Sequence, residues 1–316
     1  MRIFRYVCML MVVVTLSCNK DDVVTITLDN SHYRAATSSS DIQWDVVCEY
    51  TPAPGAYIHD VEKGGFTGEE LTAEAAAAYA ERRMREAKFV SLGGFGGYIV
   101  VGFDHSIDNI VGGDIAIRGN AFDGSSEPGV VWVMQDMNGD GKPNDEWYEL
   151  RGSETGKAET IQEYAVTYFR PEADGQPVKW RDSEGAEGEI DYLKAFHPQP
   201  SYYPEWIKED SYTLTGTRLK ARNYDASGNG SHWILPSYDW GYVDNFSAQD
   251  YLPEQKVVNL FDIANAMDAQ GESVELKYID FVKVQTACNA KSGWIGENST
   301  EVYDFYDYGL KQKRDE

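Results

Sequence analysis

Residues 130–150 read VVWVMQDMNGDGKPNDEWYEL, and this stretch decides the fold class. Two runs of β-branched and aromatic residues, 130–134 and 147–150, flank a turn rich in Asp, Asn and Gly. Such runs are typical of strands, and the polar turn between them is typical of a β-hairpin. Similar strand-forming runs, separated by turn residues, occupy residues 98–103, 114–117, 164–169, 212–215 and 279–284. We therefore expect a mainly β chain, folded as an antiparallel β-sandwich of jelly-roll-like type.

One segment near residues 72–88 is expected to be helical. Thr72 is a suitable N-cap, and the residues up to Lys88 are dominated by the strong helix formers Ala, Glu and Arg. From residue 42 onward no shift of composition marks a second domain. Residues 42–316 are therefore expected to form a single β-sandwich domain that binds a ligand, with two packed subdomains as the alternative.

The N-terminus has the pattern of a bacterial lipoprotein. Two arginines precede an apolar run from Val7 to Leu16, which is far shorter than the roughly 20 residues that span a bilayer. Residues 1–17 are expected to be a signal peptide, and Cys18 the lipidated first residue of the mature chain. Residues 18–41 would then form the lipidated N-terminus and a tether. Ordinary secretion with an incidental cysteine is the alternative.

Charge and the residues after Cys18 bear on location. Asn-Lys-Asp-Asp occupies residues 19–22. Lys-Asp-Asp at this place resembles the surface-export signal of Bacteroidota lipoproteins, which implies an outward-facing position on the outer membrane. The chain has 28 basic and 52 acidic residues, a net charge of −24. This charge repels nucleic acids and anionic headgroups, so neither is an expected partner and the membrane is contacted through the lipid alone.

Cys48 and Cys288 are the two other cysteines of the mature chain. In an oxidising compartment they would form one disulfide that ties an early strand to a late one. Free buried thiols are the alternative, and sequence spacing does not separate the two.

The turn of the opening stretch has the spacing of a calcium loop. Oxygen-bearing side chains stand at its positions 1, 3 and 5, and Gly141 follows at position 6, where a sharp turn is needed. Trp147 stands at position 12, so the bidentate glutamate of an EF-hand is missing. We expect a structural calcium ion, and an ion-free turn is the alternative. The predicted ligands are Asp136, Asn138, Asp140, Asn144 and the backbone carbonyl of Lys142.

No local motif indicates catalysis. Neither H-E-x-x-H nor G-x-S-x-G occurs, and the five histidines show no ligand spacing, so we expect no enzyme. The glycine stretch 93–97 is expected to be a turn between strands, because no lysine follows it as in a phosphate-binding loop. A pair of carboxylates brought together only by folding would escape this search.

Two proline-containing aromatic stretches, 197–206 and 232–245, are expected to be loops that contact a ligand. Flat rings beside polar neighbours can stack on a sugar face or a macrocycle. The alternative is that these rings fill the ends of the sandwich. The predicted ligand-binding residues are Tyr203, Trp206, Trp233, Tyr238, Trp240 and Tyr242.

Several stretches together resemble a family of Bacteroidota cell-surface lipoproteins that are associated with PKD domains. Besides the hairpin and residues 279–284, the matching pieces are residues 49–55, 90–97, 119–129, 240–245 and 296–301. Ala56 departs from the pattern, in which Gln follows Pro54-Gly55. Some members are similar to the surface lipoproteins of vitamin B12 uptake loci. The resemblance implies capture of a nutrient for a TonB-dependent transporter, with a cobamide as the leading ligand.

Two other functions stay open at this point. One is glycan binding for a polysaccharide uptake system, and the other is calcium-dependent adhesion. A further possibility is glycan hydrolysis by carboxylates that are dispersed in the sequence, and no local pattern selects it.

Overall fold

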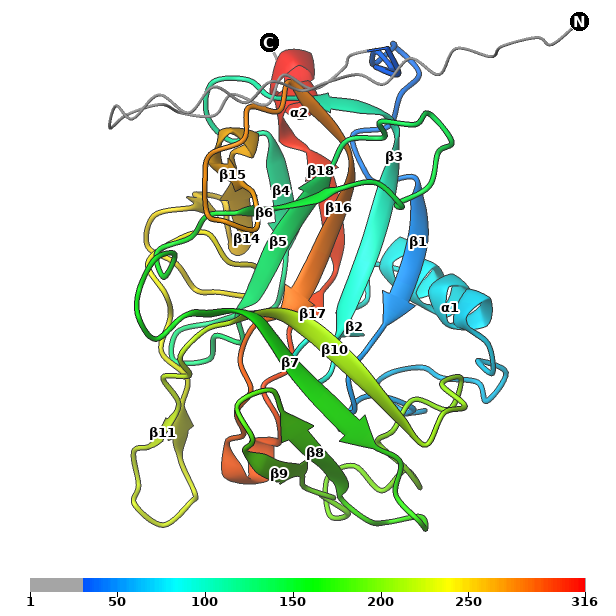
Figure 1. The fold of residues 1–316 in the computed structure, drawn as a ribbon, viewed down its shortest axis with the longest axis vertical. Coiled ribbons are helices and arrows are strands. Elements are labelled where there is room, and N and C mark those ends of the chain that lie inside the picture. The colour runs from blue at the N-terminus through cyan, green and yellow to red at the C-terminus, as the bar shows by residue number, and fades with distance from the viewer. Residues whose placement is uncertain (1–30, 316) are drawn as a thin grey trace, which may run out of the picture.

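The computed structural model describes residues 31–315 (Figure 1). The predicted signal peptide, Cys18 and the tether up to residue 30 lie outside the described residues. The main sheet is antiparallel and contains six strands, in the order β1 (Val46–Thr51), β3 (Tyr98–Asp108), β16 (Tyr278–Thr286), β5 (Gly129–Met134), β6 (Trp147–Leu150) and β15 (Ala266–Met267).

A second antiparallel sheet lies behind the first in Figure 1. Its strands are β13 (Tyr251–Leu252), β14 (Gln255–Phe261), β4 (Ile115–Arg118) and β18 (Asp304–Asp307). Alternate residues of both sheets, such as Val131, Val282, Ile117 and Phe305, meet in one buried apolar cluster. Period-two alternation places these side chains on one face of each strand, and burying that face holds the two layers together. The β-sandwich expected from the sequence is confirmed.

The hairpin of the opening stretch is confirmed with its register. Strands β5 and β6 pair antiparallel, with Val133 opposite Tyr148 and Met134 opposite Trp147. The other predicted strand runs are also found, each within a few residues of its expected bounds. Gly93 and Gly96 have φ of +68° and +82° in the predicted glycine turn before β3.

A third sheet extends one end of the sandwich (Figure 1). It contains β10 (Ser211–Arg218), β7 (Ile161–Phe169), β8 (Val178–Asp182) and β9 (Glu187–Ile190). It has an apolar cluster of its own, built around Tyr164, Tyr168 and Phe95. Gln285 of β16 donates to the Thr215 carbonyl oxygen of β10 at 3.0 Å, which links this sheet to the main one.

Two short strand pairs and four helical segments complete the fold. The pairs are β2 (Val90–Ser91) with β17 (Glu301–Val302), and β11 (Tyr224–Asp225) with β12 (Trp233–Ile234). The helical segments are α1 (Ala73–Arg85), α2 (Tyr308–Asp315), η1 (Ile263–Asn265) and η2 (Gly293–Ile295). Among the described residues, no helix is both long and apolar enough to span a membrane.

Helix α1 begins where the sequence predicts. The Thr72 hydroxyl accepts a hydrogen bond from Ala75 N at 3.2 Å, as an N-cap does. The helix ends at Arg85, three residues early, because Ala87 adopts a left-handed φ of +55°. Lys88 N then donates to the Arg83 carbonyl at 2.9 Å, which closes the last turn.

Cys48 and Cys288 are free thiols in the structure. Cys288 is buried beside the hydroxyl of Tyr238, whereas Cys48 lies half-buried on the outer face of the main sheet. Of the two readings, the structure therefore has the free thiols, and no disulfide joins Cys48 to Cys288.

Candidate functional site

The loop between β5 and β6 brings the predicted calcium ligands together. Asn138 Nδ2 donates to Asn144 Oδ1, and Asn144 Nδ2 donates to Asp140 Oδ2, both at 2.9 Å. The Lys142 carbonyl accepts from Asn144 N at 2.9 Å and keeps a second lone pair. Side chains that are separate in the sequence thus meet around one point.

Asp136 anchors this loop to the sandwich. Its Oδ1 and Oδ2 accept the backbone N–H groups of Gly139 and Gly141, both at 2.9 Å. The two glycines have φ of +70° and +72°, the left-handed region that Gly adopts most readily. Asp136 N donates to Asp280 Oδ2 of β16 at 2.8 Å. The all-oxygen donor set fits a calcium ion, and the ion itself stays a prediction.

A second loop repeats this pattern and was missed from the sequence. Asp225, Ser227 and Asn229 stand at positions 1, 3 and 5, followed by Gly230. Asp225 Oδ2 accepts from Gly230 N at 2.7 Å, and Asp225 Oδ1 accepts from Ser227 N at 2.9 Å. These bonds order the β11–β12 turn.

Four of the six predicted ligand-binding rings lie in the core. Tyr203, Trp206, Tyr238 and Tyr242 are between 0 % and 7 % exposed and pack in three separate apolar clusters. A ligand cannot stack on a ring that its own protein covers, so the prediction is wrong for these four residues. Large aromatic side chains gain most from burial, and this outweighed the loop character of their surroundings.

The two other rings, Trp233 and Trp240, are partly exposed. A Cβ on Gly293 would lie 2.5 Å from Trp233 Nε1, so this indole packs on the backbone next to Trp294. Trp240 lies away from that region, where its carbonyl accepts from Ser153 N at 3.0 Å. The predicted aromatic residues therefore do not form one surface.

A cavity of about 400 Å³ lies close to Trp294, between parts of the chain that are far apart in the sequence. Three of the stretches that carried the family resemblance, 119–129, 240–245 and 296–301, converge on its acidic floor. The cavity is lined by Tyr57, Lys63, Phe89, Asn120, Phe122, Ser125, Glu127, Phe196, His197, Trp294, Ile295, Glu297, Ser299 and Glu301.

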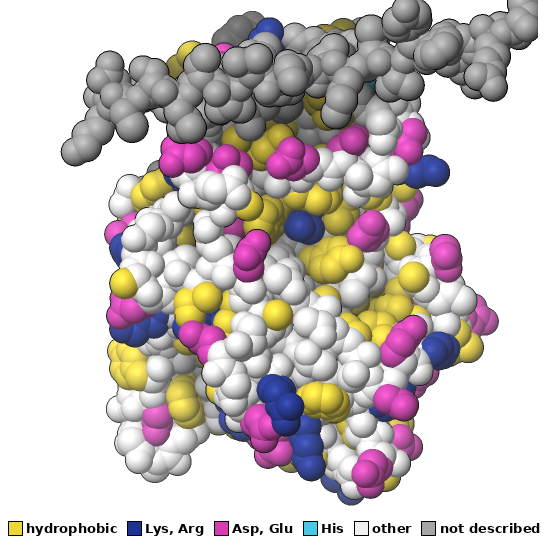
Figure 2. Space-filling model, viewed as in Figure 1, with side chains coloured by type: hydrophobic (Ala, Val, Ile, Leu, Met, Phe, Trp, Pro, Cys, Tyr) yellow, Lys and Arg dark blue, Asp and Glu magenta, His cyan; other side chains and the backbone are white. Residues whose placement is uncertain are grey.

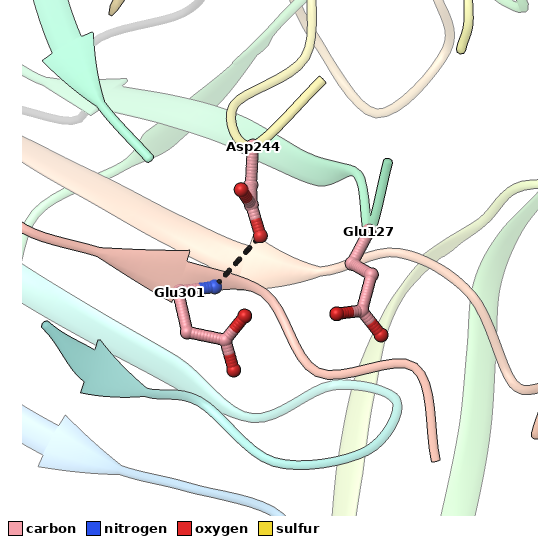
Figure 3. Close-up of side chains that lie close together, drawn as sticks. All are labelled: Glu127, Asp244 and Glu301. Carbon is pink, nitrogen blue, oxygen red and sulfur yellow. Dashed lines mark hydrogen bonds between the residues drawn. The ribbon is translucent and has the colours of Figure 1, made fainter. Parts of the chain in front are cut away.

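Three carboxylates meet at the floor of this cavity (Figure 3). Glu127, Asp244 and Glu301 each present an oxygen, and these oxygens lie within 4.8 Å of one another. Asp244 lies beneath the lining, and its Oδ2 accepts from Glu301 N at 3.0 Å. Among residues 31–315 no other trio of Asp, Glu, His or Cys side chains comes this close together.

Backbone contacts fix the position of Asp244. Its neighbour Val243 exchanges two hydrogen bonds of 2.9 Å with Gly129, and Asp244 itself has a left-handed φ of +55°. Its Oδ1 accepts from Asn120 N at 2.8 Å. Gly119 permits this close approach, because a Cβ there would lie 2.7 Å from the Asp244 Cα.

The two glutamates are held by neighbouring strands and turns. Glu127 Oε1 accepts from Ser299 N at 3.1 Å, and the Glu127 carbonyl accepts from the Thr300 hydroxyl at 2.9 Å. Glu301 opens β17 opposite Ser91 of β2, so its side chain leaves the strand on the side away from buried Val302.

The cluster concentrates negative charge in a buried place. Burial, which excludes water from the carboxylates, raises the pKa of Asp244 to about 7. Burial first and neighbouring carboxylates second raise the pKa values of Glu127 and Glu301 well above the usual range. No ion pair among the described residues involves any of the three. We therefore expect these carboxyl groups to hold protons or to share a bound cation.

Glu297 adds a fourth carboxylate to the cavity. Its Oε1 accepts from Ala56 N at 2.7 Å, whereas its Oε2 is buried without a hydrogen-bond partner in the described chain. The side chain is 5 % exposed, and burial raises its pKa to about 7. An acceptor that is buried without a donor points to a ligand or ion that supplies one.

Exposed aromatic rings form the rim of the cavity. Phe122, Phe196 and Trp294 are 63 %, 51 % and 47 % exposed. The rings of Phe196 and Trp294 lie 5.8 Å apart at 42°. Tyr57 lies deeper, edge-on to His197 with a centroid distance of 4.7 Å. The rim therefore offers apolar faces above a polar floor.

The donor set fits a hard divalent cation. Two oxygens bound to one calcium ion at about 2.4 Å can lie up to about 4.8 Å apart, and the oxygens of the three carboxylates lie within this limit. The ligands are all oxygen, which favours calcium, magnesium or manganese over zinc. Binding of a cation there would also displace protons from Asp244 and the neighbouring carboxyl groups.

No sequence pattern predicted the cluster of Glu127, Asp244 and Glu301. Asp244 and Glu301 are 57 residues apart, and Glu127 lies in a polar loop of undecided role. The family resemblance was the one available signal, because its pieces contain all three residues. Comparison with protein-family models and with curated proteins finds no match to this chain.

Proposed function

We propose that this protein is a cell-surface lipoprotein that binds a glycan in the cavity, through a divalent cation held by Glu127, Asp244 and Glu301. The observation that carries the proposal is a trio of converging carboxylates below exposed aromatic rings, with Asp244 and Glu301 buried, Glu127 partly exposed and no ion pair to any of the three in the described chain. Ligand sites commonly combine apolar walls with a few converging polar groups in a cavity of about 300–1,000 Å³. Calcium is the expected cation, since the medium outside a cell supplies it near millimolar concentration.

A sugar matches both surfaces of the cavity. Its C–H face stacks on flat rings such as those of Phe196 and Trp294. Its hydroxyl groups coordinate calcium and donate to carboxylates, and the orphan Oε2 of Glu297 is one such acceptor. The side chains of Asn120 and Ser125 line the same wall and offer further polar contacts. The volume of about 400 Å³ favours one or two sugar units at a time.

The location and the onward route of the ligand are parts of the same proposal. Cys18 carries the lipid, and residues 19–22 direct the protein to the outer face of the outer membrane. The bound ligand then passes to a TonB-dependent transporter. The support for this part is the N-terminal sequence and the family resemblance.

A cobamide is the second candidate ligand, and a separate groove favours it. This groove holds about 740 Å³ and runs along β8 and β9, with Phe169, Trp180 and Lys291 among its lining residues. The indole of Trp180 lies flat against Gly188, where a Cβ would be 2.4 Å away. An open groove with a flat ring suits a macrocycle better than the smaller cavity does.

Calorimetric titration of the mature protein tests the proposal. Calcium is titrated into chelator-treated protein first, then a glycan panel is titrated with and without calcium, and cyanocobalamin is titrated last. We expect a glycan whose affinity falls at least tenfold in chelator. Equal glycan affinity without calcium would contradict the metal-dependent site, and heat from cyanocobalamin alone would favour the second candidate.

Three variants separate the parts of the site. Glu301→Gln is expected to abolish calcium binding in the cavity together with glycan binding. Trp294→Ala is expected to keep calcium binding and to weaken the glycan by about 1 kcal/mol, roughly five- to tenfold. Tyr224→Ala is the matched control, because Tyr224 is 51 % exposed and lies outside the cavity. If reducing ends are released from the glycan, the site hydrolyses its ligand and does not only bind it.

A further inference from the structure

Lys283 projects from the outer face of the main sheet, opposite the sandwich core. In β16 it pairs with Val100 of β3 on one side and with Trp132 of β5 on the other. Trp132 in turn pairs with Glu149 of β6, so one row of side chains crosses the sheet. Figure 2 looks onto this face and shows a basic side chain among hydrophobic ones, with acidic side chains around them.

Three aromatic rings surround the amine. Lys283 Nζ lies 4.6 Å from the ring centre of Trp132, 4.9 Å from that of Trp147 and 6.0 Å from that of Tyr98. No hydrogen bond or ion pair of Nζ is found within residues 31–315. The closest favourable contacts of the amine are therefore with ring faces, and Glu49 and Glu149 attract it without forming an ion pair.

The neighbouring carboxylates are engaged elsewhere. Glu49 of β1 accepts from the Tyr98 hydroxyl at 3.0 Å, and Glu149 accepts from the Thr217 hydroxyl. Cys48 is the other ionisable group on this part of the sheet, and burial keeps its thiol protonated by raising its pKa to about 12. Lys283 is thus the one basic side chain that faces this ring cluster in the described chain.

A groove of about 420 Å³ gives access to the amine. Strand β10 forms one wall with Thr213 and Thr215, and Tyr98 and Trp147 contribute flat rings to the other sides. Lys283 lies half-buried in this groove. A small molecule can therefore reach Nζ and place an apolar body against the rings.

The surroundings favour the neutral, nucleophilic form of the amine. Burial lowers the pKa of Lys283 from 10.5 to about 8, with Glu49 and Glu149 opposing the change. At pH 7.5 the free-amine fraction is therefore on the order of 100-fold that of an ordinary lysine. Burial also raises the pKa of Glu149 to about 7, so this residue carries an exchangeable proton near neutral pH.

We propose that Lys283 is a carbonyl-capture site, at which an aldehyde or ketone with a flat or apolar body becomes bound as an imine. The Nζ lone pair forms the new C–N bond, and one of the two amine protons passes through solvent to the carbonyl oxygen, which gives a neutral carbinolamine. Glu149 then donates a proton through solvent to the hydroxyl group, which leaves as water, while the second nitrogen proton returns through solvent to the Glu149 carboxylate and the C=N bond forms. Addition of water reverses the sequence, and no oxidant or reductant is needed.

Reductive trapping tests this site directly. The mature protein is treated with benzaldehyde and cyanoborohydride at pH 7.5, and the modified lysines are quantified by peptide mass spectrometry. We expect Lys283 to be labelled at least tenfold faster than exposed lysines such as Lys277. Labelling of Lys283 no faster than that of Lys277 overturns the proposal.

Two variants distinguish a reactive amine from a purely structural one. Trp147→Ala opens the cage while Lys283 stays in place, and it should slow labelling of Lys283 severalfold at pH 7.5 but little at pH 10. Lys283→Arg removes the fast adduct, whereas the matched variant Lys277→Arg retains it. If Lys283 has only a structural role through its contacts with the rings, its labelling stays slow and Trp147→Ala leaves the labelling rate unchanged. That result refutes the proposal.

Discussion

Substituting Glu127 by Gln should stabilise the calcium-free protein and weaken its stabilisation by calcium. The substitution keeps an oxygen that can accept the Ser299 N–H bond but removes one negative charge from the cluster. Two full charges within 4.8 Å repel by about 3 kcal/mol at an effective dielectric constant near 20. Partial protonation of the cluster reduces this repulsion, so we expect the calcium-free variant to be more stable by about 1–3 kcal/mol.

Calcium should offset this difference between the two proteins. At 5 mM calcium and a dissociation constant of about 0.1 mM, typical of extracellular sites, binding stabilises the folded wild type by about 2 kcal/mol. In a chain of this size each kcal/mol shifts Tm by roughly 2 °C. We therefore expect Glu127→Gln to melt a few degrees above wild type in EDTA and to lose most of the calcium-induced rise.

The assay is thermal unfolding by circular dichroism at pH 8, in EDTA and in 5 mM calcium. Calcium in the hairpin loop stabilises both proteins equally, so the difference between them reports on the cavity. Glu272→Gln is the matched control, since Glu272 is exposed and lies outside the cluster. A Glu127→Gln protein that is less stable in EDTA, yet keeps the full response to calcium, would refute the reasoning.

Three further predictions concern pH, the hairpin and the glycine turn. Burial raises the folded-state pKa of Asp244 to about 7, so between about pH 4 and 7 the folded chain holds a proton that the unfolded chain has released. The free energy of unfolding in EDTA should therefore fall with rising pH in this window, by about 1 kcal/mol per pH unit. A Tm that rises from pH 5 to 7.5 would contradict this. Combined Asp136→Ala and Asp140→Ala substitutions should remove the part of the calcium-induced Tm rise that the Glu127→Gln protein retains. If the double variant shows the full rise, the hairpin does not bind calcium. Gly97→Ala should cost about 3 kcal/mol in urea unfolding, because its Cβ would lie 1.8 Å from the Leu92 carbonyl oxygen; a loss under 0.5 kcal/mol would argue against this turn geometry.

The aromatic loops show where sequence reasoning failed and why. Prolines and polar neighbours around Tyr203 and Tyr238 indicate loops, and both residues do lie in loops. Their rings nevertheless turn inward and fill gaps between the sheets, because covering a large ring releases more free energy than leaving it in water. The exposed rings of the cavity rim, Phe122, Phe196 and Trp294, stand in stretches with no aromatic pattern.

The sequence by itself determined seven of the strands, the start of α1 and the hairpin whose loop gathers Asp136, Asn138, Asp140 and Asn144. These features depend on neighbours within about a dozen residues, so the spacing of residues along the sequence is enough to predict them. Only the tertiary structure decided the trio of Glu127, Asp244 and Glu301, because three distant segments contribute one carboxylate each. Burial raises the pKa of all three carboxyl groups, and repulsion between carboxylates raises those of Glu127 and Glu301 further; neither effect exists until the sheets have packed.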